Sequence, residues 1–545
     1  MSQMKRRVQF FCQSLICAAT LLLLSCGGSG SGSPSTGSAG SDPPVVAGTP
    51  LTVSDVDAAI HSAVMAVNVP IEVAVVDRVG NILGVFGTVN APATGMGNFG
   101  TTPPADELAV ALARTGAFFS NDQAPLSSRT VRYISGVHFP PGVAGAPNAA
   151  LYGIENTNRG CPFHANYLPG QAVPPAHPIS GTGPGLGIIT GKANVDDSDP
   201  TAVNPGGVPL FKGGVVVGGI GVVAADVNVA EYAAFVAATS APFAITPAAP
   251  GVVIINGVAL PFVNNSTAPA GITAGTFNGS YTVGPLASPG PDPTGWLVGP
   301  TASAYPGGLS QADVTKVVNA AIATANVTRA AIRLPIGARA RMMISVADLD
   351  GNLLAIYRMV DATVFSIDVS AAKARNVVYF TSTGGRLPGA YTDSQPGSVD
   401  LPGVPPGTAV TNRTISFGAQ PFFPPGINGS NPGPFFNLYM FDTANPCTQG
   451  SQPANKYQNG IVFFPGALPL YRNGVLVGGL GVSGDGVDQD DFVTAGGAAE
   501  MTLNSASQAS QSGQGFEAPT AIRADQVVID NVRLPYIKFP RNPTQ

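Results

Sequence analysis

The sequence predicts an α+β fold of two tandem domains, each an antiparallel sheet flanked by helices, with long Gly/Pro-rich insertions. The first observation behind this prediction is a repeat: residues 51–60, 217–222 and 252–262 are echoed by residues 309–318, 477–482 and 527–536. A repeat of this length is far longer than a solenoid unit, so each copy should have its own core. The second observation is that helix-like and strand-like segments follow one another in the same order in both copies.

Each copy is expected to begin with a helix. Ser54 and Ser310 are the predicted N-caps, because a serine hydroxyl can accept a hydrogen bond from a free N–H of the first turn. The helices should run over residues 55–66 and 311–325, where apolar residues recur at helical spacing.

Short strands around Gly-Asn turns predict a hairpin next in each copy. A second helix and a long insertion follow, and a Gly-rich strand pair and another helix close the copy. Helices gathered around an antiparallel sheet define the α+β class. The predicted ranges are 71–76, 82–86, 105–119 and 208–222 in the first copy, and 341–347, 353–357, 366–379 and 468–482 in the second, with insertions at about 120–207 and 383–460.

The first residues predict export. Residues 5–7 are basic, and residues 10–24 are mostly apolar but too short for a comfortable membrane span, so residues 1–25 are predicted to be a signal peptide. The following Cys26 completes a segment that resembles a bacterial lipobox. The resemblance implies lipidation of Cys26 and, with glycine next, anchoring in the outer membrane of the cell envelope; an acylated end with several chains anchors stably.

The remaining domain boundaries follow from composition. Residues 26–48 are rich in Gly, Ser and Pro and almost uncharged, which is typical of a flexible tether. The first domain is then expected at residues 49–300 and the second at residues 301–545. The whole chain of 545 residues is 44% apolar and contains 68 Gly and 51 Pro with only 10% charged residues, which favours two cores with ordered, loop-rich insertions.

The charge balance bears on partners. Without residues 1–25, the chain has 23 basic and 31 acidic residues, a net charge of −8. This balance gives no reason to expect nucleic acid or an anionic membrane surface as a partner. Contact with a membrane is expected through the N-terminal lipid only.

Two cysteines fall at corresponding places in the two copies. Cys161 and Cys447 each follow a Leu-Tyr segment and an Asn residue. In an oxidising compartment an even pair favours a disulfide, and equivalent positions can meet if the copies pack about a pseudo-twofold axis. A bridge between the domains and two separate buried thiols both remain open.

Four motifs of the second copy carry a family resemblance. They are Val346-Ala-Asp-Leu-Asp-Gly-Asn-Leu-Leu354, then Arg358-Met359-Val-Asp361-Ala362, then Ala371-Ala-Lys373-Ala-Arg375, and a Gly-rich segment from Asn473 to Gly484 with Asp488 and Asp490 beyond it. Together they resemble the GlcG/HbpS family of haem-binding domains, over about residues 309–382 and 461–500. The resemblance implies a profilin-like fold, an oligomeric assembly that the tandem copies would form as an internal pseudo-dimer, and haem as a cofactor.

The first copy resembles this family only in a degenerate form. It keeps Asp77 and the Gly80-Asn81 turn, and Arg114 matches Arg375. Leu112 stands where Lys373 would align, and Val223 replaces Ser483.

The motif residues allow two interpretations. Arg358 and Asp361 follow a strand and Lys373 and Arg375 lie on the next helix, so they can form an internal ion-pair cluster. Alternatively, with Ser483, they bind a ligand, since Arg offers a planar fork and Lys a point charge to haem propionates. Asp348 is expected to serve the hairpin turn.

The histidines bear on the haem hypothesis. His61, His138, His164 and His177 all lie in the first copy, so axial ligation in the second copy would use Tyr379 or Met359. His164 follows Cys161 by three residues, but two candidate ligands do not make a metal site, and no metal centre is predicted.

No catalytic motif of a common hydrolase, metalloprotease or nucleotide-binding enzyme occurs. The sequence therefore predicts an exported, lipid-anchored protein that binds haem or a related small ligand. The alternative is a cofactor-free lipoprotein whose loops form an interaction surface. An enzyme acting on haem is neither supported nor excluded.

Overall fold

The computed structural model describes residues 48–245, 250–381, 400–450, 455–499, 501–505, 508–511 and 515–544. The predicted signal peptide, Cys26 and nearly all of the tether lie outside these residues. Residues 44–545 form one compact unit. Within it, an N-terminal half (residues 49–300) packs against a C-terminal half (residues 301–545). In the ranges given above, no helix combines the length and apolar composition that a bilayer crossing requires.

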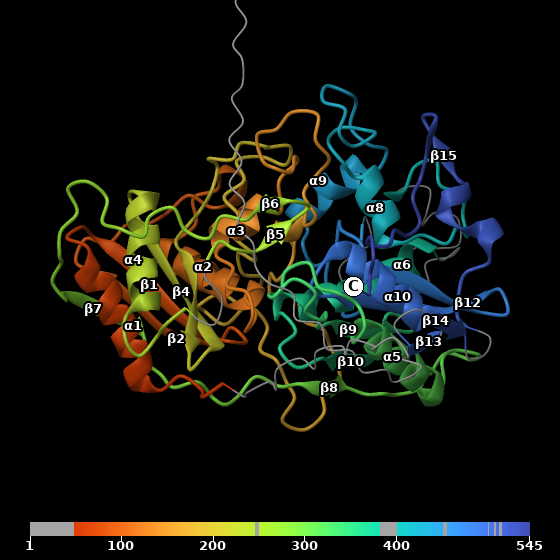
Figure 1. The fold of residues 1–545 in the computed structure, drawn as a ribbon, viewed down its shortest axis with the longest axis horizontal. Helices are drawn as coiled ribbons and strands as arrows, with labels where there is room; N and C mark the ends of the chain where they lie inside the picture. Colours follow the sequence, from red (N-terminus) through yellow and green to blue (C-terminus); the bar gives the residue numbers. More distant parts are fainter. Residues whose placement is uncertain are drawn as a thin grey trace, which may run out of the picture. The chain divides into compact units, whose positions relative to one another are not determined.

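Two five-stranded antiparallel sheets organise the chain (Figure 1). The first sheet has the order β3-β4-β1-β2-β7 and the second the order β11-β12-β9-β10-β8, so corresponding strands hold corresponding places. This confirms the predicted α+β class. The first sheet contains β1 (Ile71–Asp77), β2 (Ile82–Thr88), β3 (Gly207–Lys212), β4 (Val215–Ala224) and β7 (Gly279–Val283), and the second contains β8 (Gly295–Val298), β9 (Met343–Ala347), β10 (Leu353–Arg358), β11 (Ala467–Arg472) and β12 (Val475–Ser483).

The edge strands β7 and β8 come from the segment that links the two halves. β7 pairs with β2, and β8 pairs with β10. The sequence analysis missed both strands because they are short and each pairs across a register irregularity. β8 precedes residue 301 yet completes the second sheet.

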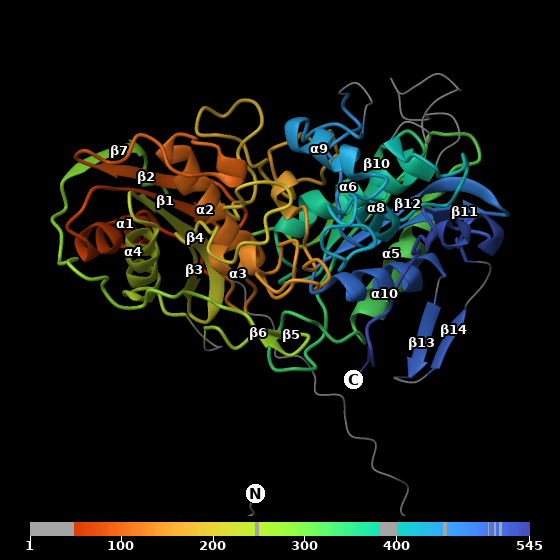
Figure 2. The same ribbon diagram turned by 90° about the horizontal axis from the view of Figure 1, so that it is seen from above.

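Helices cover both faces of each sheet (Figure 2). On the first sheet, α1 (Val53–Ala66) and α4 (Val227–Thr239) pack on one face and α2 (Ala105–Phe119) on the other. On the second sheet, α5 (Gln311–Ala325) and α10 (Val487–Ala498) likewise pack on one face and α6 (Phe365–Thr381) on the other. β1 is therefore buried along its whole length, which explains why it is apolar at nearly every position.

The first helix begins two residues earlier than predicted. Thr52, and not Ser54, is the N-cap of α1: its hydroxyl accepts from the N–H of Asp55 at 3.2 Å, and the Asp55 carboxylate accepts from the N–H of Thr52. Both candidates have an aspartate three residues on, but only Thr52 and Asp55 form this reciprocal capping box; Asp57, three residues after Ser54, accepts from the Tyr281 hydroxyl instead. Ser310 caps α5 as predicted, through the same box with Asp313.

Glycines in the central strands allow a helix to lie directly on each sheet. A Cβ at Gly481 of β12 would overlap the carbonyl oxygen of Ser370 in α6, and one at Gly221 of β4 would overlap that of Ala109 in α2. The Gly-rich segments thus serve close backbone approach, as their position on a hairpin strand predicted.

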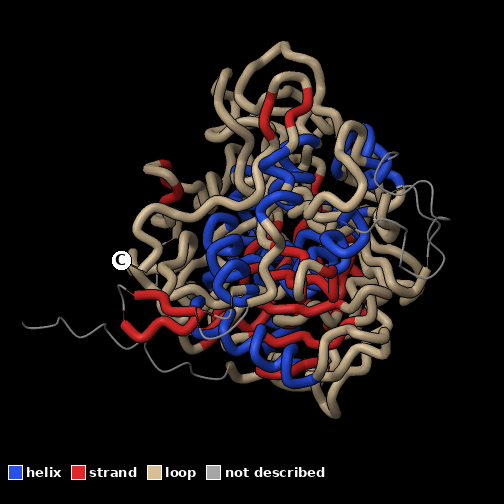
Figure 3. The backbone as a smooth tube through the Cα atoms, turned by 90° about the vertical axis from the view of Figure 1, so that its right-hand side faces the viewer, coloured by secondary structure: helices blue, strands red, loops and turns tan. Residues whose placement is uncertain are grey.

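The insertions of the two halves also correspond. α3 (Ser128–Tyr133) and α8 (Asn412–Gly418) each begin with a capping box. In each box the threonine three residues after the cap also donates to a proline carbonyl of the repeated segments 252–262 and 527–536, from Thr130 to Pro261 at 2.6 Å and from Thr414 to Pro535 at 2.7 Å. The remaining elements are α9 (Phe436–Ala444), the hairpins β5 (Ile254–Ile255) with β6 (Val258–Ala259), β13 (Met501–Ser505) with β14 (Gln508–Gln511) and β15 (Val528–Ile529) with β16 (Val532–Arg533), and the 3-10 turns η1 (Asn98–Gly100), η2 (Ile154–Asn156), η3 (Thr520–Ile522) and η4 (Ala524–Gln526). Long loops connect these elements (Figure 3).

The halves meet where α2 ends and α6 begins. The rings of Phe119 and Phe365 stack with their centroids 4.1 Å apart. The N–H of Val364 donates to the carbonyl of Phe118 at 3.0 Å. Helix ends from both halves therefore share one apolar contact, and neighbouring residues of both ends line the pocket between the halves.

Candidate functional site

The basic residues of the predicted ligand cluster lie inside the C-terminal half. Arg358 is fully buried, and its Nε and Nη2 donate to the carbonyl of Ala362 at 3.0 and 2.8 Å. Its Nη1 pairs with Asp292. Lys373 is also fully buried, and its Nζ donates to Asp490 at 3.0 Å and to the carbonyl of Val482 at 2.9 Å.

Arg375 holds the hairpin turn. Its Nε donates to the carbonyl of Gly351 at 2.9 Å and its Nη2 to that of Phe163, in the first insertion, at 2.7 Å. Arg114 does the same in the N-terminal half, where its Nε donates to the carbonyl of Gly80 at 3.1 Å. Two matching arginines thus make matching contacts with the backbone.

The other predicted ligand residues have protein partners as well. Asp361 pairs with Arg333 at 2.5 Å, and the hydroxyl of Ser483 donates to that of Ser366 at 3.1 Å. Of the predicted axial residues, Tyr379 donates to Asp400 at 2.9 Å, and the sulfur of Met359 accepts from the N–H of Met342 at 3.4 Å. A buried charge or hydroxyl needs such a partner, and here the protein supplies it.

A pocket of about 520 Å³ lies where the halves meet, and we call it the junction pocket. Residues 158–176 of the first insertion form one side, Val79 and Phe118 belong to the N-terminal half, and Val364, Ile367 and Asp368 come from the start of α6. Most of the lining is apolar, and its polar side chains are Asn158, His164, Tyr167 and Asp368. A mainly apolar pocket of this size with a few polar groups is typical of a small-molecule site. None of the residues of the predicted ligand cluster lines it.

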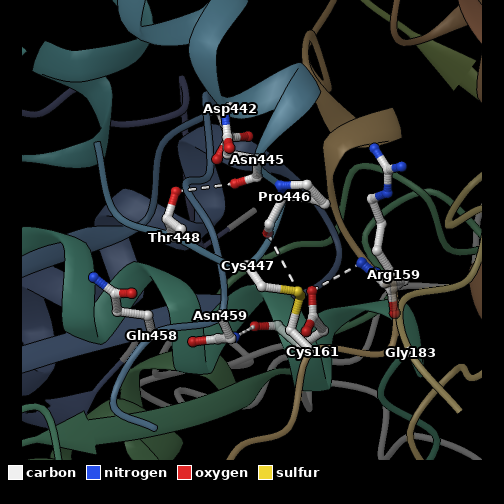
Figure 4. The surroundings of a disulfide bond; sticks show 12 residues. Arg159, Cys161, Gly183, Asp442, Asn445, Pro446, Cys447, Thr448, Gln458 and Asn459 are labelled. Atoms are coloured by element: carbon white, nitrogen blue, oxygen red, sulfur yellow. Dashed lines mark hydrogen bonds between the residues drawn. A yellow bond between two sulfur atoms is a disulfide. The ribbon is translucent and has the colours of Figure 1, made fainter. Parts of the chain in front are cut away.

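A disulfide borders the junction pocket, and Figure 4 shows the bond and its surroundings. Cys161, a lining residue, is bonded to Cys447 of the C-terminal half, and their Cα atoms are 5.5 Å apart. Of the two possibilities left open by the sequence, the structure contains the bridge. The bond ties the first insertion to the second next to the pocket.

Asp368 is the buried carboxyl of the pocket. It accepts from the N–H of Asn158 at 2.8 Å, and burial raises its pKa to about 6, against a lowering by Arg375. Burial, assisted by the charge of Asp368, also raises the pKa of the Tyr167 phenol to about 12. The pocket therefore offers a neutral phenol and a carboxyl that changes charge in the mildly acidic range. Perturbed groups in an apolar pocket mark functional sites.

Sequence reasoning missed the junction pocket because its walls come from three distant segments. One signal was present: His164 follows Cys161 by three residues, and both line the pocket. Among the residues that the structure describes, no group of three or more His, Cys, Asp or Glu side chains could hold a metal ion.

The fold and the site define an α+β protein with two antiparallel sheets and a small-ligand pocket between its halves. Residues 309–499 match the family model described as "Haem degrading protein HbpS-like". The C-terminal half therefore contains an HbpS-like domain, as the motifs predicted.

Two solved structures are similar to the chain. The crystal structure of a PduOC:Heme complex is 20% identical over 37% of this chain and 98% of that chain, with a TM-score of 0.22. The Klebsiella pneumoniae protein ORFY is 20% identical over 34% of this chain and 85% of that chain, with a TM-score of 0.21. No curated protein matches the chain.

Proposed function

We propose that the protein binds a flat, largely apolar ligand of the haem class in the junction pocket. The observation that carries this proposal is the pocket itself, with its volume of about 520 Å³ and its apolar walls. The HbpS-like match over residues 309–499 supports haem as the ligand to test first.

The lining fits such a ligand in two respects. Phe118, Phe163, Val173 and Ile367 supply apolar surface for the faces of a macrocycle, and His164 and Tyr167 supply a nitrogen and an oxygen donor that could hold an iron. Among the residues that the structure describes, no Lys or Arg lines the pocket, and Asp368 would repel anionic groups when ionised. The ligand's carboxylates should therefore point out of the pocket.

The chain's own residues would bind and orient the ligand. The apolar walls supply contact surface, the disulfide at Cys161 holds one side in place, and Arg375 fixes the carbonyl of Phe163. Bound haem would supply a redox-active iron. The arrangement supports binding, and no reaction step follows from it.

For Arg358, Asp361, Lys373, Arg375 and Ser483 we propose the structural interpretation. They stabilise the HbpS-like domain as internal partners, and none of the five is among the residues that line the junction pocket. Their ligand-binding interpretation stays a prediction, which the Lys373 experiment below tests.

The test is titration of the full chain, purified in detergent, with haemin. Ala165 lines the pocket and is half-buried, whereas Ala144 is exposed and outside it. We expect saturable binding with a Soret shift, lost in Ala165→Trp because the indole fills the pocket, and retained in Ala144→Trp. Loose binding that is equal in all three proteins would contradict the proposal and favour the cofactor-free interaction protein.

We further propose that the halves are two profilin-like copies that form an internal pseudo-dimer, and that the protein is exported and anchored in the outer membrane through Cys26. The matching sheet orders support the first idea, and the disulfide supports an oxidising compartment. Mass spectrometry should find lipid on Cys26 and none in Cys26→Ser. An unmodified Cys26 in membrane fractions would contradict the anchor.

A further inference from the structure

We infer that His164 is the side chain that ligates the iron of a haem-class ligand in the junction pocket. His164 lies on the insertion of the N-terminal half, and residues of the HbpS-like domain complete the pocket that it lines. This inference rests on the proposed function and deepens it. It also accounts for a C-terminal half that has no histidine of its own.

His164 has an unusual backbone conformation. His164 has φ 49°, in the left-handed region, and it follows Cys161 by three residues. Its counterpart three residues after Cys447 is Gly450, with φ 56°. A non-glycine residue in this region costs about 1–3 kcal/mol, and such strain gathers at functional sites. The N-terminal half thus carries an imidazole at a position where glycine would be less strained.

His164 lies between two fixed points of the chain. Cys161 is held by the disulfide, and the carbonyl of Phe163 accepts from the buried Arg375 at 2.7 Å. Beyond it, Tyr167 bridges to Val298 of β8, in the second sheet. The backbone is held on both sides of His164, so less backbone entropy is lost when the imidazole binds an iron.

The four histidines differ in their contacts. Within the described part of the chain, the His164 imidazole makes no hydrogen bond, and it lines the pocket. His138 contacts Asn428 through Nε2 at 2.8 Å, and Nδ1 of His177 contacts the carbonyl of Gly183 at 2.9 Å. His61 lies on α1, its ring is tilted against that of Phe277 with the centroids 5.0 Å apart, and it does not line the pocket.

Tyr167 is the competing donor in the pocket. A phenol must give up its proton to ligate ferric iron, whereas a neutral imidazole ligates without ionising. We therefore place His164 first and make Tyr167 the alternative that the variants below test.

The decisive variant is His164→Gly in the full chain. Glycine accepts the left-handed backbone without strain, so the variant should fold. We expect haemin affinity to fall at least about tenfold, since replacing even an outer-shell partner of a metal ligand lowers metal affinity by about 10–100-fold. The Soret band should shift, and added imidazole should restore it. Tyr167→Phe and the matched control His177→Ala should keep the wild-type spectrum.

The outcomes separate the inference from the proposed function. A His164→Gly protein with the wild-type affinity and spectrum would overturn the assignment of His164 while leaving haem binding intact. If the Soret band shifts in Tyr167→Phe and not in His164→Gly, the iron ligand is the Tyr167 phenol and the assignment of His164 is overturned. Failure of the wild-type chain to bind haemin saturably would overturn the proposed function and the inference with it.

Discussion

The buried pair of Lys373 and Asp490 distinguishes a structural cluster from a ligand site. The Lys373 ammonium is 3.0 Å from Asp490, and the two side chains are 0% and 3% exposed. Lys373→Met keeps the apolar stem and removes the charge, which leaves Asp490 buried and unpaired. Breaking a buried pair in this way costs about 3–5 kcal/mol of unfolding free energy.

The pH dependence of this loss is also predicted. Burial already raises the pKa of Asp490 to about 7, and removing Lys373 should raise it further. Asp490 then takes up a proton more readily in the folded than in the unfolded state, so the penalty grows as pH rises. The loss of stability in Lys373→Met should therefore be larger at pH 8 than at pH 6.

Urea unfolding followed by tryptophan fluorescence measures this loss. The only tryptophan, Trp296, lies in β8 and therefore reports on the second sheet. A double variant, Lys373→Met with Asp490→Leu, should regain most of the stability, because replacing both partners by apolar groups is close to neutral. It should also bind haemin like the wild type. A stably folded double variant that no longer binds haemin would refute the structural reasoning and support the ligand interpretation.

Three further predictions concern other parts of the molecule. Asp368→Asn should gain roughly 2 kcal/mol in unfolding free energy relative to wild type between pH 4 and pH 7, because the folded pKa of about 6 lies above the reference 3.8; a pH-independent difference in urea unfolding would contradict this. Gly481→Ala should lose at least about 2 kcal/mol through overlap with α6, whereas Gly290→Ala, with open space around it, should be near neutral in the same assay. Replacing Cys161 and Cys447 by serine should cost about 2–5 kcal/mol and weaken haemin binding, and unchanged melting and binding would contradict the role of the bridge.

The regular elements could be predicted because local signals determine them. The ranges of α2 and α5 agree with the apolar spacing, and the Gly-Asn turns place the hairpins. The start of α1 was wrong because Ser54 and Thr52 both look like caps, and only the reciprocal contact with Asp55 chooses between them. The short strand β8 has no comparable local signal.

The candidate site could be predicted only in part. The motifs placed Arg358 and Lys373 close together, yet the sequence could not show that Asp292 and Asp490 neutralise them. The junction pocket depends on long-range packing of an insertion against α6, which no spacing rule describes. His164 was visible beside Cys161, but its importance follows only from the pocket and from the backbone conformation it shares with Gly450.

The binding of a haem-class ligand in the junction pocket can be tested by growing a crystal of the full chain with haemin and collecting anomalous data at the iron edge. We expect one iron peak in the junction pocket, within bonding distance of the His164 imidazole. A peak among Arg358, Lys373 and Ser483, or no ordered iron at saturating haemin, would contradict it.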